Sequence, residues 1–284
     1  MKRILSLVVT LLVILTLCAC GNKDTDGSNA DQSNAGNQAT EGFDDKVTAN
    51  EDYFEWDGNL ITAVTPDGSK QKSILIPTRC EGFAGVIFQN TEIEHVAFED
   101  DDDVALDFAF MGAKNVISVK LPSNLTTIPS MGFQMCEQLK DIVIPASVTT
   151  LESYAFSSCD SLMSVEFAGK GIATIGDNCF EGCKALKKIS IPDGVTSIGK
   201  YAFFECSSLS DVELSATVNA IAKFAFGNTA ITEISFPEGI EFTTMDTSAF
   251  GTNAYTTVVY IVKGSWCDNN QDSWNIGFSE VKYK

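Results

Sequence analysis

The sequence predicts a mostly β solenoid of about eight stacked coils, with a small β cap before it and a β/α cap after it. Two observations lead to this fold class. Phenylalanine recurs at intervals of 22 to 24 residues, and a short apolar pattern follows each of these phenylalanines at nearly fixed offsets. The members of the series are Phe88, Phe110, Phe133, Phe156, Phe180, Phe203, Phe226 and Phe250.

Each coil of about 23 residues contains one clear strand pattern. In the coil of Phe133, Ile142 and Ile144 follow nine and eleven residues later. Alternate apolar residues lie on one face of a strand, and Pro145 ends this strand because proline cannot donate to a ladder. One coil buries about six apolar side chains, which cannot offset the entropy of ordering its backbone. The coils therefore fold only when they stack on one another.

A resemblance to a known family rests on the coil from Leu186 to Cys206. This coil reads Leu-x-x-Ile-x-Ile-Pro-x-x-Val-Thr-x-Ile-Gly-x-x-Ala-Phe-x-x-Cys, and the pattern resembles the leucine-rich repeat of the BspA-like bacterial surface proteins. The resemblance covers residues 74–255. It implies a right-handed leucine-rich-repeat solenoid with a parallel sheet on one face. It also implies extracellular protein–protein interaction, because several family members are described as adhesins for host matrix proteins.

The N-terminal residues 1–19 read as a signal peptide. A basic start, Met1-Lys2-Arg3, precedes an apolar run from Ile4 to Leu17 that is too short to span a bilayer comfortably. The segment Leu17-Cys18-Ala19-Cys20 resembles a bacterial lipoprotein signal, with Cys20 as the lipidated residue. We therefore expect a bacterial protein held to the cell membrane by its lipid anchor, on the extracytoplasmic face or the cell surface. The alternatives are a plain signal peptide or a membrane-anchoring helix.

The segments that flank the solenoid have their own patterns. Residues 20–45 are mostly small or polar, which predicts a disordered tether. Residues 46–73 contain two strand patterns around Asp57-Gly58 and form the N-terminal cap. Residues 256–284 form the C-terminal cap, with strands at 257–262 and 279–283 and a helix within 264–275 that Ser265 caps. Trp266 and Trp274 are expected to act as lids over the last coil.

Composition excludes several classes of function. The formal net charge is -19, and only Arg3 and Arg79 are arginines, so nucleic-acid binding is excluded and the membrane is contacted through the lipid anchor alone. The chain has one histidine, and it has no P-loop, dinucleotide fingerprint or Gly-x-Ser-x-Gly elbow. We therefore expect a protein that is not an enzyme and holds no cofactor.

Cysteine and acidic clusters offer no strong metal site. Cys136, Cys159, Cys183 and Cys206 share one coil position, which predicts a ladder of buried thiols. Parallel thiols are poorly placed for disulfides, and a line of rungs does not converge on zinc. The acidic run 99–103 predicts a solvated loop, with weak calcium binding as the alternative. His95 is expected on the surface.

Two surfaces are candidates for binding. The outward strand positions include Lys140, Met163, Glu166, Lys187, Lys188, Asp211 and Glu213. The residues two before the repeated phenylalanines include Tyr154, Tyr201 and Phe224, which form an aromatic stripe if they are exposed and otherwise pack on the next coil. The predicted function is a non-catalytic, membrane-tethered protein–protein interaction module, of which adhesion to host proteins is one form. The alternative is a protein that binds cell-wall or dietary glycans, or an envelope scaffold.

Overall fold

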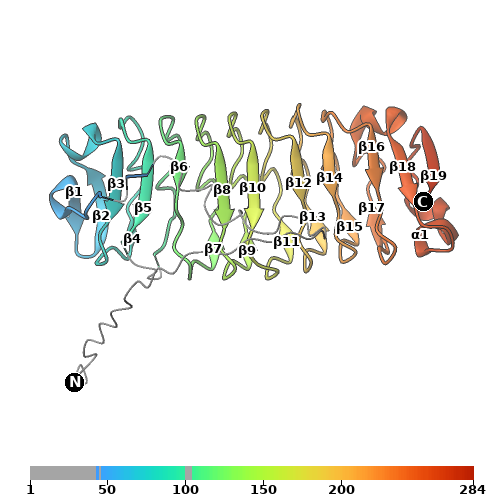
Figure 1. Ribbon diagram of the computed structural model, residues 1–284, viewed down its shortest axis with the longest axis horizontal. Helices are drawn as coiled ribbons and strands as arrows, with labels where there is room; N and C mark the ends of the chain where they lie inside the picture. The colour runs from blue at the N-terminus through green and yellow to red at the C-terminus, as the bar shows by residue number, and fades with distance from the viewer. Residues whose placement is uncertain (1–42, 45, 100–103) are drawn as a thin grey trace, which may run out of the picture. The chain divides into compact units, whose positions relative to one another are not determined.

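The chain folds as a solenoid of parallel strands, as predicted. The computed structural model describes residues 43–44, 46–99 and 104–284, which lie in one compact unit. In Figure 1 the strands lie side by side in chain order, from β1 and β2 at the blue end to β18 and β19 at the red end. The predicted signal at 1–19, Cys20, the tether as far as residue 42 and residues 100–103 of the acidic run lie outside the described residues.

One long face of the solenoid carries the main strands. Within the described residues ten of them follow one another: β3 (Ser73–Ile76), β5 (His95–Phe98), β6 (Ser118–Val119), β8 (Asp141–Ile144), β10 (Ser164–Phe167), β12 (Lys188–Ser190), β14 (Asp211–Glu213), β16 (Glu233–Ser235), β18 (Val258–Ile261) and β19 (Glu280–Tyr283). They form three parallel ladders, β3–β5–β6, β8–β10 and β12–β14–β16–β18–β19. The solenoid thus has about ten turns rather than the predicted eight, because β3 precedes the first repeated phenylalanine and β19 comes from the C-terminal cap.

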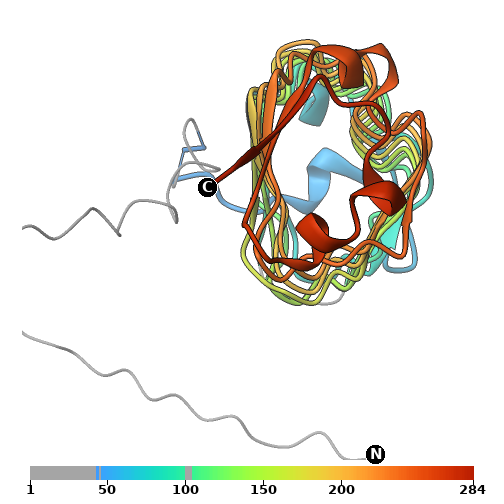
Figure 2. The same ribbon diagram turned by 90° about the vertical axis from the view of Figure 1, so that its right-hand side faces the viewer.

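A second face carries shorter strands of two residues each. These are β7 (Thr127–Ile128), β9 (Thr150–Leu151), β11 (Thr174–Ile175), β13 (Ser197–Ile198), β15 (Ala220–Ile221) and β17 (Thr244–Met245), and they pair in parallel in that order. The register sets Ile128 opposite Leu151, so equivalent residues of neighbouring coils lie rung on rung. Figure 2, which looks along the stack, shows the coils superposed as one closed outline.

The third side is closed by a set of backbone hydrogen bonds that we call the turn ladder. In the coil of Phe156, the N–H groups of Tyr154, Phe156 and Ser158 donate to carbonyls of the next coil at 2.9, 2.8 and 2.7 Å. Tyr154 and Ser158 have φ of 60° and 61°, in the left-handed region. Other coils repeat this geometry, so two residues that flank the phenylalanine adopt a backbone conformation that costs free energy for any residue but glycine.

The repeated phenylalanines form one continuous stack inside the coils. Neighbouring ring centroids lie 4.6 to 5.3 Å apart, and the ring planes differ by 1° to 24°. Every ring of the stack is buried. Stacked aromatic rings gain free energy beyond the burial of their area, so each coil stabilises the next through this column.

Both caps contain the predicted elements. At the N-terminal end β1 (Phe54–Asp57) and β2 (Leu60–Val64) form an antiparallel hairpin, and β2 continues in parallel to β4 (Gly82–Phe83). The 3-10 helices η2 (Glu51–Tyr53), η3 (Gly68–Lys70) and η4 (Gly251–Thr256) lie outside the sheets. The predicted C-terminal helix is two short ones, α1 (Trp266–Asn269) and α2 (Gln271–Trp274).

The lid residues and the helix cap at the C-terminal end are in place. The Ser265 hydroxyl accepts a hydrogen bond from the Asp268 N–H at 3.3 Å, as a cap does. The Trp274 ring is buried with its centroid 5.1 Å from that of Phe236, while Trp266 is partly buried against the core. Over the described ranges, no helix is long and apolar enough to cross a bilayer.

Candidate functional site

The predicted outward residues lie on what we call the sheet face, the exposed side of strands β8, β10, β12 and β14. Lys140, Met163 and Lys187 each come seven residues after a stacked phenylalanine, so they occupy the same place in three successive coils. The Met163 N–H donates to the Lys140 carbonyl at 2.7 Å, which fixes this register. We call these three side chains the lysine–methionine column. Met163 is 53% exposed at its centre, an unusual exposure for a large apolar side chain.

The expected basic patch of three lysines is smaller than predicted. The Lys188 ammonium lies 2.6 Å from Glu213 Oε1 and 3.4 Å from Asp211 Oδ2. Lys188 and the Ser190 hydroxyl, which both donate to Glu213, hold the pKa of that carboxyl below its usual value. Lys140 and Lys187 make no ion pair within the described residues. The available positive charge of the patch therefore comes from these two, because Lys188 is locally neutralised.

A groove interrupts the sheet face between β10 and β12. These two strands are neighbours in the stack, yet β10 pairs with β8 alone and β12 with β14 alone. The groove has a volume of about 520 Å³, and strand residues of both sides line it: Met163, Glu166, Phe167, Lys188, Ser190 and Pro192. We call it the sheet groove.

The sheet groove has a cause in the sequence. The interval from Phe156 to Phe180 is 24 residues, and Ala168-Gly169-Lys170-Gly171 replaces the turn that begins with Pro145 or Pro192 in the neighbouring coils. The extra residue falls between the strand and the second apolar pair of this coil. Since one added residue breaks the alignment of a strand with its neighbour, the ladder stops after β10.

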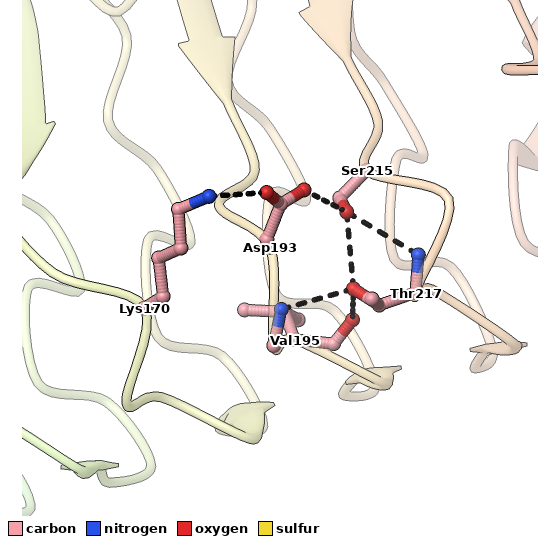
Figure 3. A network of polar contacts seen from close by, with 6 residues as sticks. Lys170, Asp193, Val195, Ser215 and Thr217 are labelled. Atoms are coloured by element: carbon pink, nitrogen blue, oxygen red, sulfur yellow. Dashed lines mark hydrogen bonds and ion pairs between the residues drawn. The ribbon is translucent and has the colours of Figure 1, made fainter.

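A network of polar side chains holds the altered turn in place (Figure 3). The Lys170 ammonium lies 2.5 Å from Asp193 Oδ2, and the Ser215 hydroxyl donates to Asp193 Oδ1 at 2.8 Å. The Thr217 hydroxyl accepts from the Gly194 N–H at 3.1 Å and donates to the Val195 carbonyl at 2.8 Å. The ammonium of Lys170, followed by the hydroxyl of Ser215, lowers the pKa of Asp193. The network links three successive coils beside the sheet groove.

A second groove lies near the C-terminal end of the sheet face, with a volume of about 430 Å³. Asp211, Glu213 and Glu233 line it together with Tyr260, whose hydroxyl donates to Glu233 Oε1 at 3.5 Å. We call it the acidic groove. Sequence reasoning included its carboxylates among the outward residues but missed Tyr260, whose strand lies outside the repeat pattern.

The aromatic stripe is partly covered by its own members. The Tyr201 and Phe224 rings stack with centroids 5.5 Å apart and planes 24° apart, and Phe204 packs edge-on against both. Tyr154, Tyr201 and Phe224 are all half-buried. The alternative interpretation, packing against the next coil, is confirmed for Tyr201 and Phe224. Phe204, which the sequence analysis passed over, follows directly after the stacked Phe203.

The thiols and the histidine are committed to packing. Cys136, Cys159, Cys183 and Cys206 are buried and unpaired, and each donates to a phenylalanine carbonyl of the previous coil at 3.0 to 3.2 Å. Burial raises the pKa of Cys159 and Cys183 well above the usual value, so these thiols stay protonated. His95 is half-buried rather than exposed, and its Nδ1 lies 2.8 Å from the Ser118 hydroxyl. Across the described part of the chain, no cluster of three or more His, Cys, Asp or Glu side chains could hold a metal ion.

Comparison with solved structures places the fold among bacterial repeat proteins. A leucine-rich repeat protein from Bacteroides ovatus matches with a TM-score of 0.58 and 24% identity, and the match covers 79% of this chain and 64% of that one. A leucine-rich repeat protein from Eubacterium ventriosum (21% identity, 63% of this chain and 58% of that one) and the T. pallidum leucine rich repeat protein (24% identity, 63% and 77%) each give a TM-score of 0.47. At these identities the likeness concerns the fold alone.

Sequence comparison identifies the family. No curated protein matches the chain significantly. The BspA type leucine rich repeat region matches it in six copies, over residues 67–163 and 126–257. These ranges span well over half of the chain and coincide with the stacked coils. The chain therefore belongs to the BspA-type leucine-rich repeat family.

Proposed function

We propose that this protein is a non-catalytic interaction module that recognises another protein through its sheet face. The observation that carries the proposal is the lysine–methionine column. It sets an exposed apolar side chain between two lysines without ion pairs, on strands that successive coils hold in register. Exposed apolar groups beside charged ones, on a rigid surface, are features of protein recognition sites.

The side chains able to do acid–base or nucleophilic chemistry have other partners in the described residues. The Cys159 and Cys183 thiols are buried and protonated, and the hydroxyl of Ser118 contacts the imidazole of His95 without a third group to orient the ring. Among the carboxylates of the sheet face, Asp211 and Glu213 already hold the Lys188 ammonium. These contacts favour packing and recognition over catalysis.

The anchor belongs to the proposal as well. We infer a lipid-modified Cys20 that holds the module to the extracytoplasmic face of a bacterial membrane, from the signal pattern Leu17-Cys18-Ala19-Cys20. Radiolabelled palmitate supplied to cells that express the full chain should label the protein. Cys20→Ala should abolish the label, and Cys18→Ala should leave it unchanged. Equal labelling of both variants would refute lipidation at Cys20.

Binding to immobilised partners tests the recognition function. The full mature chain, in detergent micelles, would be measured in parallel against extracellular-matrix proteins and against cell-wall and dietary glycans. Saturable protein binding that Lys187→Glu weakens and Lys200→Glu leaves unchanged supports the proposal, since both lysines are exposed but Lys187 alone lies on the sheet face. Glycan binding that Tyr201→Ala weakens would favour the glycan alternative. No binding to either set would favour a structural role in the envelope.

A further inference from the structure

We propose that the sheet groove is a specificity pocket for one large apolar side chain of a protein segment whose neighbouring residues are acidic. In the bound state the apolar side chain fills the groove between β10 and β12, and the flanking carboxylates contact Lys140 and Lys187. The proposal rests on the proposed function, because it names the place and the partner chemistry of the same sheet face.

The groove exposes apolar surface that the other coils hide. Val165 and Phe167 occupy the strand positions nine and eleven after Phe156, and both are only partly buried. In every other coil from Phe110 to the last, the two equivalent side chains are at most 8% exposed: Val119, Leu121, Ile142, Ile144, Ile189, Ile191, Val212, Leu214, Ile234, Phe236, Val259 and Ile261. The apolar side of the strand is therefore accessible in a single coil of this set. Covering it with a partner's apolar side chain would contribute about 25 cal/mol per Å² of apolar surface removed from water.

The groove is a fixed feature of the backbone. The ion pair between Lys170 and Asp193 and the bonds from Asp193 to Ser215 tie the altered turn to the two coils that follow (Figure 3). Gly194, with φ of 101°, lies so close to the Lys170 carbonyl that a Cβ at this position would overlap it. A pocket that is already formed binds its ligand without a further ordering cost.

Charge selects the segment that brings the apolar side chain. Lys140 and Lys187 flank Met163 in the lysine–methionine column, and neither has an ion pair in the described part of the chain. Carboxylates on either side of the inserted side chain would face these two ammonium groups. The net charge of -19 opposes an acidic partner at long range, but salt screens exposed charges beyond about 8 Å. A basic segment would instead be drawn to the acidic groove.

The polar groups of the sheet groove do not suit a sugar. The Lys188 ammonium and the Ser190 hydroxyl already donate to Glu213. What remains accessible is the thioether of Met163, the ring of Phe167 and the ring of Pro192, with Glu166 as the one remaining carboxylate. A surface of this kind binds an aromatic or aliphatic side chain better than a hydroxyl-rich ring.

The test uses the methyl group of Met163 as a reporter inside the groove. The full mature chain, labelled with ¹³C at the methionine methyls and held in detergent micelles, would be titrated with short synthetic peptides. The probe has a central tryptophan flanked by aspartate and glutamate. Two matched peptides replace the tryptophan by serine or the acidic residues by lysine. Met163→Leu assigns the reporter signal.

The expected result is a saturable shift of the Met163 methyl with the acidic tryptophan peptide. Each matched peptide should bind at least about tenfold more weakly. Lys140→Glu with Lys187→Glu should weaken the tryptophan peptide by a similar factor. Lys200→Glu with Lys263→Glu, an equal change of charge at exposed sites away from the groove, should leave its affinity unchanged.

Three outcomes would overturn the pocket. They are no shift of Met163 with the tryptophan peptide, equal shifts with the lysine-flanked peptide, and an equal shift with a neutral oligosaccharide. If a matrix protein still binds the chain while the tryptophan peptide leaves Met163 unmoved, the pocket is refuted and the protein-recognition function stands. If the peptide shifts Met163 but no protein binds, the pocket stands and the wider function needs another partner.

Discussion

Removal of the Phe156 ring tests the physical basis of the solenoid. Phe156 is fully buried, and its centroid lies 5.1 Å from that of Phe133 and 5.3 Å from that of Phe180. Phe156→Ala should lower the free energy of unfolding by about 4–5 kcal/mol, near the upper end for the loss of a buried phenylalanine. The value is high because the cavity cannot close. The turn ladder fixes the spacing of the neighbouring rungs, with the Phe156 N–H 2.8 Å from the Cys179 carbonyl and the Phe133 N–H 2.8 Å from the Ala155 carbonyl.

The assay is urea denaturation of the purified protein, followed by circular dichroism. Phe108→Ala is the matched control: Phe108 is also in the repeat but 46% exposed, so its loss should change the free energy of unfolding by about 0.5 kcal/mol or less. Because each coil contacts only its neighbours, Phe156→Ala should also uncouple the two halves and broaden the transition. A change below about 1 kcal/mol for Phe156→Ala would show that the ring stack does not hold the coils together.

Four further predictions follow from individual positions. Glu205→Gly should raise the free energy of unfolding by about 1 kcal/mol, because Glu205 has φ of 59° and is exposed, whereas Gln138→Gly, at an exposed position outside the left-handed region, should lower it by about the same amount; urea midpoints that move in the same direction for both would contradict this. Gly194→Ala should lower the midpoint by more than Gln138→Gly does, because its Cβ would overlap the Lys170 carbonyl, and an unchanged midpoint would argue against the close approach. Burial, more than the charge of Lys140, lowers the pKa of His95 below 6.5, so the unfolded chain takes up this proton at higher pH than the folded one, and the free energy of unfolding should fall as the pH drops below about 6.5; His95→Gln should remove that part of the slope between about pH 7 and pH 5, and an identical slope in the variant would refute it. Cys159 should resist iodoacetamide at about pH 8 in the native protein and react in denaturant, as mass spectrometry of the peptides would show, and modification of the native protein would mean that the thiol is accessible.

Most of the fold could be predicted from the period of the sequence. The spacing of the phenylalanines placed the ring stack, and residues nine and eleven after each of them gave the inward side of the strands. The thiol ladder followed from the shared position of Cys136 and Cys159. These features depend on local chemistry that repeats from coil to coil, so the average pattern describes every rung.

What could not be predicted depends on contacts between coils. The neutralisation of Lys188 requires Asp211 and Glu213, which lie in the next coil and join it through side-chain geometry rather than sequence spacing. The turn ladder was hidden because bulky residues such as Tyr154 occupy its left-handed positions, where sequence reasoning expects glycine. The break in the sheet had a visible signal, the 24-residue interval after Phe156, but an interval of the same length follows Phe226 and leaves β16 paired with β18.

The break in the sheet gives this repeat protein a way to fix the position of a partner. A regular solenoid presents nearly the same surface on each coil, so a partner that reads one coil can shift to the next at little cost in free energy. Discrimination between such registers requires a feature that occurs once, since specificity is a difference between affinities. In the described sheet, the exposed side chains of Val165 and Phe167, the Met163 methyl between two lysines and the altered turn at Lys170 all fall in the coil of Phe156. A partner that inserts a side chain there would bind in one register, and regular coils on both sides would add area without competing for the anchor.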